Sequence, residues 1–304
     1  MLRRRLTAYN TATASENRIH DDATAQRFGF TGGLVPGVCL HAYLAWGPAA
    51  AWGMEWLTHG SLSTRYRAPT YDGSEVTTEF DEADGACRLR SADGTVLADG
   101  VAALPDSAPP PPDPDDYPVR PLPSPRPTAS PEYLTPGRAL GSLDLSFPDD
   151  VAVTYLDDVR EVLDVYRDEA IAHPGWVLRL ANTLLKSNLE LGPWIHASSR
   201  VQHHDVVRSG AAADVRARVD AEYERSGHRF VDLDVAVWAD GAPVATILHT
   251  AIYLPRQVRE AAATSDTPTT SRATAGEATA GEAPTRDAIT GDVEPSGGVG
   301  PSGG

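Results

Sequence analysis

The sequence is poor in cysteine, in positive charge and in long apolar runs, and each shortage excludes a class of protein. Two cysteines, Cys39 and Cys87, are too few for a disulfide framework and lack the spacing of a metal-ligand pair. Both lie in apolar or strand-like surroundings. We therefore expect buried thiols, no metal site and a reducing cytoplasm.

Positive charge is scarce along all 304 residues. Lys and Arg number 26 against 42 Asp and Glu, the formal net charge is −16, and the longest basic run is Arg3-Arg4-Arg5. Nucleic-acid binding requires a basic surface, so we exclude a nucleic-acid partner. Residues 1–15 lack the apolar core of a signal peptide. The most apolar stretch, residues 35–57, is interrupted by Pro48 and Glu55, which argues against a membrane span.

Proline is abundant instead, and it is concentrated in one place. Of the 25 prolines, 13 lie between Pro105 and Pro136. This composition favours an extended, polyproline-like connector over residues 105–138, laid on the surface of the protein. The apolar residues expected to anchor the connector are Tyr117, Leu122, Tyr133 and Leu134.

The two halves of the chain follow the same pattern. In each half a Pro-Gly step opens an apolar helix, from Val38 to about Trp46 and from Trp176 to about Lys186, and period-two alternation follows. The predicted strands are residues 61–67, 75–82, 87–90 and 96–104, then 195–203, 215–224, 229–238 and 244–254. The shared landmarks are Pro36-Gly37 and Pro174-Gly175, the Ala-Asp-Gly turns at 92–94 and 239–241, and the Leu-Pro ends at 104–105 and 254–255.

These landmarks recur in the same order at a nearly constant spacing, which indicates two copies of one α+β unit. The units are predicted at residues 1–104 and 139–257. Residues 258–304 contain almost no large apolar side chain, so we expect a disordered tail there.

Polar residues and glycines gather just before the first buried helix. Asn17 and His20 precede Asp21-Asp22, which offers a cap for a short helix, and a Gly-rich loop then leads to Gly37. A helix N-terminus has free N–H groups and a positive dipole end. Placed at a thioester carbonyl, such an N–H stabilises the enolate that forms when water adds to the neighbouring double bond. A histidine at the same point can move the proton.

On these residues the sequence resembles the MaoC-like (R)-specific enoyl-CoA hydratase/dehydratase family. The matching residues are Asn17, His20, Asp22, Gly29-Phe30 and Gly37, and the resemblance covers about residues 10–105. It implies a double-hotdog fold of class α+β, in which two antiparallel sheets each wrap a central helix. It also implies an acyl dehydratase or enoyl-thioester hydratase of fatty-acid metabolism. The substrate then arrives as a thioester of coenzyme A or acyl carrier protein, with no separate cofactor, and the chain is a monomer or homodimer.

The sequence departs from the family at the catalytic carboxylate. The family's catalytic Asp falls on Ser15, which cannot act as a carboxylate base, and Glu16 beside it is the nearest substitute. The usual His before the helix glycine is Pro36. The departures leave an alternative, an acyl-thioester-binding subunit without chemistry of its own. A carboxylate within hydrogen-bond reach of His20 favours the enzyme, and its absence favours the binding subunit. A hotdog thioesterase is least favoured, because the only acid near the helix, Glu55, comes late.

The candidate catalytic residues are therefore His20, Asn17, Glu16 and Ser15, and the candidate substrate-binding residues are Gly37, Pro36, Val38 and Gly33. We expect His20 to handle the proton, Asn17 to orient water or His20, and the Gly37 N–H to polarise the carbonyl. The alternatives are a structural histidine beside a helix and a glycine required by close helix–sheet packing. Three arginine pairs are either a solvated sheet face or a patch for the phosphates of coenzyme A: Arg65 and Arg67, Arg88 and Arg90, and Arg216 and Arg218.

Overall fold

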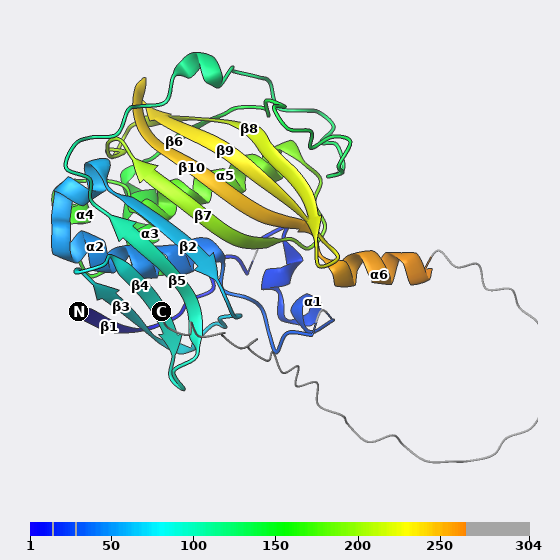
Figure 1. Ribbon diagram of the computed structural model, residues 1–304, viewed down its shortest axis with the longest axis horizontal. Coiled ribbons are helices and arrows are strands. Elements are labelled where there is room, and N and C mark those ends of the chain that lie inside the picture. Colours follow the sequence, from blue (N-terminus) through cyan, green and yellow to red (C-terminus); the bar gives the residue numbers. More distant parts are fainter. Residues whose placement is uncertain (14, 28, 266–304) are drawn as a thin grey trace, which may run out of the picture. The chain divides into compact units, whose positions relative to one another are not determined.

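A computed structural model of the chain describes residues 1–13, 15–27 and 29–265. In each half an antiparallel sheet curves around one long helix (Figure 1). The first half contains β1 (Leu2–Thr7), α2 (Gly37–His59), β2 (Ser61–Tyr66), β3 (Glu75–Asp81), β4 (Ala86–Ser91) and β5 (Val96–Ala103). The second contains β6 (Leu143–Ser146), α3 (Asp149–Asp158), α4 (Val165–Asp168), α5 (Pro174–Asn188), β7 (Ile195–His203), β8 (Ala212–Arg225), β9 (His228–Ala239) and β10 (Ala242–Leu254).

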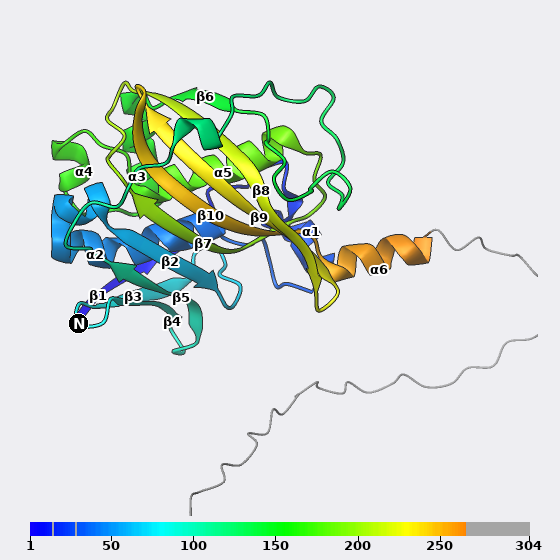
Figure 2. The same cartoon turned by 45° about the horizontal axis from the view of Figure 1, so that its top comes forward.

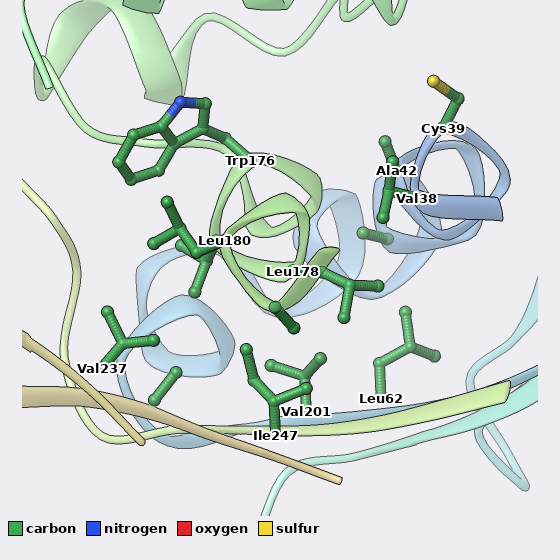
Figure 3. Packing of buried hydrophobic residues seen from close by; sticks show 14 of the residues in the cluster. Val38, Cys39, Ala42, Leu62, Trp176, Leu178, Leu180, Val201, Val237 and Ile247 are labelled. Atoms are coloured by element: carbon green, nitrogen blue, oxygen red, sulfur yellow. The ribbon is translucent and has the colours of Figure 1, made fainter. Parts of the chain in front are cut away.

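The two sheets join into one. The strand order is β1-β3-β4-β5-β2-β7-β10-β9-β8-β6, and β2 pairs antiparallel with β7 at the centre, from Ser61 opposite Gln202 to Arg65 opposite Ser198. On the inner face Leu62, Val201 and Ile247 stand in one row across three neighbouring strands. Figure 3 shows this row pointing at the two helices. The arrangement confirms the predicted double hotdog, with two pseudo-equivalent halves related across the β2–β7 pairing.

The two central helices pack side by side on the inner face of the sheet (Figure 2). Helix α2 is buried on nearly all sides, because its first turns consist of apolar residues without a polar stripe. It continues to His59, well beyond the predicted end near Trp46, with Pro48 inside it and a kink at the left-handed Gly53 (φ 57°). Within the described residues, no helix is both long and apolar enough to cross a membrane.

The connector lies against the second half of the sheet (Figure 2). Tyr117 packs on the outer face of β9 against Trp238, with ring centroids 5.7 Å apart, and its hydroxyl donates to Asp234 Oδ1 at 2.8 Å. Leu134 is fully buried, whereas Leu122 is 43% exposed and is not an anchor. The connector is not wholly extended, because a short 3-10 helix, η2 (Pro114–Asp116), begins at an Asp113 cap.

Four features of the fold were not predicted. Strand β6 pairs antiparallel with β8 at the edge of the second sheet. Strand β1 pairs along its length with β3 and extends the first sheet. Helices α3 and α4 precede α5 in the second half. Helix α6 (Arg256–Ser265) covers the first part of the tail that we expected to be disordered, so that expectation is wrong for residues 258–265. The rest of the predicted tail, residues 266–304, lies outside the described residues.

Candidate active site

The loop before α2 is folded back onto His20. A 3-10 turn, η1 (Arg18–His20), leads into α1 (Asp22–Arg27), and Asp21 caps α1 by accepting from the Thr24 N–H at 3.1 Å, as predicted. Asp22 Oδ1 accepts from the Gly33 N–H at 2.7 Å. A Cβ at Gly33 would collide with the His20 carbonyl oxygen. Gly33 therefore serves the close approach of this loop to His20 and does not line the pocket described below.

The imidazole of His20 is fixed in one tautomer. Its Nδ1 donates to the Leu34 carbonyl oxygen at 2.7 Å, so Nε2 is left with a lone pair in the neutral ring. Burial lowers the pKa of His20 below its ordinary value, although the bond to Leu34 opposes this. At neutral pH the ring is consequently uncharged, and Nε2 can accept a proton.

Asn17 contacts both His20 and the second half of the chain. Its Nδ2 donates to the Trp194 carbonyl oxygen at 3.0 Å, and its Oδ1 accepts from the Trp194 N–H at 3.3 Å. The same Nδ2 lies 3.5 Å from His20 Nε2. Since Trp194 directly precedes β7, this contact crosses between the two hotdog units and sets the distance between His20 and β7.

Gly37 opens α2 at a helix end that lacks a side-chain cap. The residue before it, Pro36, has no N–H, and its carbonyl accepts from the Cys39 and Leu40 N–H groups. Among the described residues, the Gly37 N–H has no hydrogen-bond partner. A Cβ at Gly37 would lie 2.9 Å from Tyr66 Cε2 and 3.0 Å from His196 Nδ1, so any other residue would require one of these rings to shift. Val38 is buried in the core beside it and does not line the pocket.

A pocket of about 240 Å³ joins these groups. It is lined by Asn17, His20, Pro36 and Gly37 from the first half and by residues 194–197 from the second. Its walls are otherwise mainly apolar, with Phe30, Leu34, Leu40, Ile195 and Ile252. Residues 66–70, where the chain leaves β2, also line it. The pocket thus places a histidine base and a free helix N–H around one apolar space.

His196 is a pocket residue that the sequence did not reveal. It is only 7% exposed, its Nε2 lies 2.5 Å from Ser199 Oγ, and its ring is 4.2 Å from that of His249. Residues three apart in a regular strand face opposite sides. The β7–β10 register skips Ala197, however, because Thr250 pairs with Ser198 and Ala251 with His196. This β-bulge turns His196 to the same face as Ser199.

The structure does not bring Ser15 and Glu16 into the pocket. Ser15 Oγ accepts from the Asn17 N–H at 3.2 Å, and so supports the turn. The Glu16 carboxylate is 74% exposed and pairs with Arg126 Nη1 at 3.2 Å. Among the described residues, no Asp or Glu lines the pocket, and Glu55 pairs with His59 at the far end of α2. The Glu16 carboxylate therefore lies outside the pocket and does not serve as the carboxylate of the site.

The equivalent helix end in the second half is closed. His173 Nδ1 accepts from the Gly175 N–H at 3.0 Å, which satisfies the N-terminus of α5, and His173 Nε2 donates to Glu161 at 3.1 Å. The Tyr155 hydroxyl lies directly against Gly175 and fills the space that the pocket occupies at Gly37. The helix end at Gly37 therefore opens to the pocket, whereas His173 and Tyr155 cover the end at Gly175.

No protein-family model and no curated protein matches the sequence. Among solved structures, a MaoC-like dehydratase matches with a TM-score of 0.56 and 12% identity over 83% of this chain and 98% of its own. A structure described as a MaoC domain protein dehydratase from Chloroflexus aurantiacus J-10-fl matches with a TM-score of 0.52 and 14% identity, over 84% of this chain and 96% of its own. At such identities the likeness shows the fold alone. The chain has the double-hotdog fold of the MaoC-like dehydratases.

Proposed function

We propose that the protein hydrates 2-enoyl thioesters, and in the reverse direction dehydrates 3-hydroxyacyl thioesters, in the pocket between His20 and Gly37. One observation carries the proposal: a neutral histidine with an unprotonated Nε2 and a helix N–H that has no partner among the described residues line the same apolar pocket. Addition of water to an enoyl thioester requires a base for the water and a donor for the carbonyl oxygen.

His20 alone can serve as the base for the addition of water. Its Nε2 takes a proton from water while the water oxygen bonds to C3 of the enoyl group. The double-bond electrons move to the thioester oxygen, where the Gly37 N–H stabilises the enolate. The enolate then recovers the proton from His20 at C2, and dehydration follows the same path in reverse.

The missing carboxylate is the main argument for a second candidate, an acyl-thioester-binding subunit without chemistry. No Asp or Glu of the described chain lines the pocket, and that favours the binding subunit. The hydratase is preferred because the Leu34 carbonyl already holds His20 Nδ1 at 2.7 Å. A backbone carbonyl fixes a histidine tautomer as a carboxylate does.

A groove on the outer face of the sheet is the proposed binding site for the carrier of the acyl group. Arg65, Arg88 and Arg200 line this groove, and none has a carboxylate within ion-pair distance among the described residues. Arg67 lines both the groove and the pocket, although Asp99 pairs with it at 2.9 Å. Unpaired arginines on a chain of net charge −16 favour an anionic ligand such as the phosphates of coenzyme A or of an acyl carrier protein.

The other arginines of the sequence pairs serve the protein itself. Arg90 pairs with Glu79, Arg216 with Asp214 and Arg218 with Asp234. We propose that no cofactor besides the carrier takes part, that the chain acts as a monomer or homodimer, and that it works in the cytoplasm. The free, buried state of both cysteines supports the cytoplasmic location.

The test is turnover of a series of 2-enoyl-CoA thioesters, from crotonyl-CoA to longer chains, followed by the absorbance of the conjugated thioester. We expect hydration by the full chain, and a loss of about 10²- to 10⁴-fold in kcat/KM for His20→Gln. The control is His59→Gln, at the opposite end of α2 from the pocket. Binding of these thioesters without turnover would instead identify the binding subunit.

A further inference from the structure

A buried ring nitrogen without a partner lies at the open end of α2. In the described part of the chain, His196 Nδ1 has no hydrogen-bond partner although its side chain is almost completely buried. It lies 3.0 Å from the position that a Cβ at Gly37 would take. An unsatisfied buried polar atom is costly, so a site that keeps one beside a free N–H is built to receive a ligand atom.

Hydrogen bonding behind His196 decides which of its nitrogens carries the proton. Ser199 Oγ lies 2.5 Å from His196 Nε2 and 3.5 Å from His249 Nδ1. Either direction leaves one buried N–H without an acceptor in the described part of the chain, on His249 Nε2 or on His196 Nδ1. His196 lines the pocket, where a ligand oxygen can accept from its N–H, whereas His249 does not line it. The donor chain therefore runs from His249 through Ser199 to His196 Nε2, and it leaves a proton on His196 Nδ1.

Burial and neighbouring histidines keep this network uncharged. Burial, with smaller contributions from His249 and His41, lowers the pKa of His196 well below its ordinary value, although the Ser198 backbone opposes this. Burial likewise lowers the pKa of His249 to about 3. A neutral imidazole beside a helix N-terminus is a hydrogen-bond donor that adds no charge to an already positive end.

We propose that His196 Nδ1–H and the Gly37 N–H together bind the thioester carbonyl oxygen, as a two-donor oxyanion site assembled from both hotdog units. Ser199 and His249 are positioning residues that hold the required tautomer. This inference rests on the proposed function for its substrate, a thioester. It gives the second half of the chain a direct contact with the reacting group.

The experiment uses two readouts on the full chain. The first is kcat/KM for the best 2-enoyl-CoA. We expect His196→Leu to lower it by about 10²- to 10³-fold, mainly in kcat, because one oxyanion donor is lost. His196→Asn, whose Nδ2 replaces the Nδ1–H, should recover part of the loss. Ser199→Ala should lower kcat by about tenfold, because His196 is then no longer held in the tautomer with a proton on Nδ1. The matched control is His203→Leu, a buried histidine of the same strand that does not line the pocket.

The second readout does not depend on turnover. The infrared band of butyryl-CoA labelled with ¹³C at the carbonyl should shift to lower frequency on binding, less so in His196→Leu and unchanged from wild type in His203→Leu. An equal shift in wild type and His196→Leu, or no shift in wild type, overturns the inference even if turnover is found. A shift that depends on His196 without turnover supports the inference while the hydratase proposal fails.

Discussion

Replacement of Gly37 by alanine tests the open helix end directly. The added Cβ would lie 2.9 Å from Tyr66 Cε2 and 3.0 Å from His196 Nδ1, where ordinary contact begins near 3.4 Å. Neither ring can withdraw freely, because Tyr66 and His196 pack edge to face with centroids 4.7 Å apart. The methyl group also enters the pocket at the atom that donates to the substrate.

The magnitude follows from this overlap. Relief of a clash of about half an ångström between packed rings costs about 1–3 kcal/mol of unfolding free energy. For a folded unit of this size that is a decrease of about 2–5 °C in Tm. Displacement of one oxyanion donor lowers kcat/KM by about 10²-fold or more. Activity should thus fall further than the loss of stability explains.

The assay pairs thermal unfolding with enoyl-thioester hydration at a temperature where every variant is folded. Gly192→Ala is the matched control, since a Cβ there meets no atom within 4 Å. If Gly37→Ala keeps kcat/KM within about threefold of the Gly192→Ala value, the helix end is not the carbonyl site. If its Tm is also unchanged, the packing argument is wrong as well.

Three further predictions concern charge. In a pH profile, kcat/KM should be constant above pH 6.5 and fall only below it, because the pKa of His20 is lowered from 6.5 and the base must be unprotonated. A fall in kcat/KM that begins above pH 7 as the pH is lowered would contradict the assignment of His20 as the base. Arg200→Glu should raise KM about tenfold for a CoA thioester and leave KM for the pantetheine thioester unchanged, whereas equal effects on both remove the groove as a phosphate site. Glu161→Gln should lower the free energy of unfolding by about 2–3 kcal/mol in urea titrations. Burial raises the pKa of Glu161, but His173 and the N–H groups of Leu163 and Val162 lower it below 4.5 overall. The difference in unfolding free energy should therefore persist above pH 4.5 and shrink as pH falls further. A difference independent of pH would exclude an ionised Glu161 carboxylate.

The elements of the fold were largely predictable because their signals are local. Alternation along residues 61–104 and 195–254 marks the strands that face the core on one side, and the predicted bounds agree with the structure within a few residues. The Pro-Gly steps mark the starts of both central helices. The short edge strand β1 was missed, since three consecutive arginines obscure its single buried residue, Leu6.

The site was only partly predictable. His20, Asn17 and Gly37 were found because they lie close together in the sequence and carry a recognisable spacing. The prediction for Glu16 was based on its position beside Ser15 in the sequence, but its side chain turns outward to Arg126. His196 gave no local signal, because its inward direction depends on the bulge at Ala197 in the pairing with β10.

The sequence by itself determined that two similar α+β units exist, where their helices begin, and which histidine stands before the first helix. These properties follow from short-range periodicity and from the conformational preferences of Pro and Gly. Only the tertiary structure decided which of the two helix ends is open. Tyr155 and His173 close the end at Gly175, while Trp194 and His196 come from the other half to complete the pocket at Gly37. Such contacts join residues far apart in the chain, so no local pattern records them.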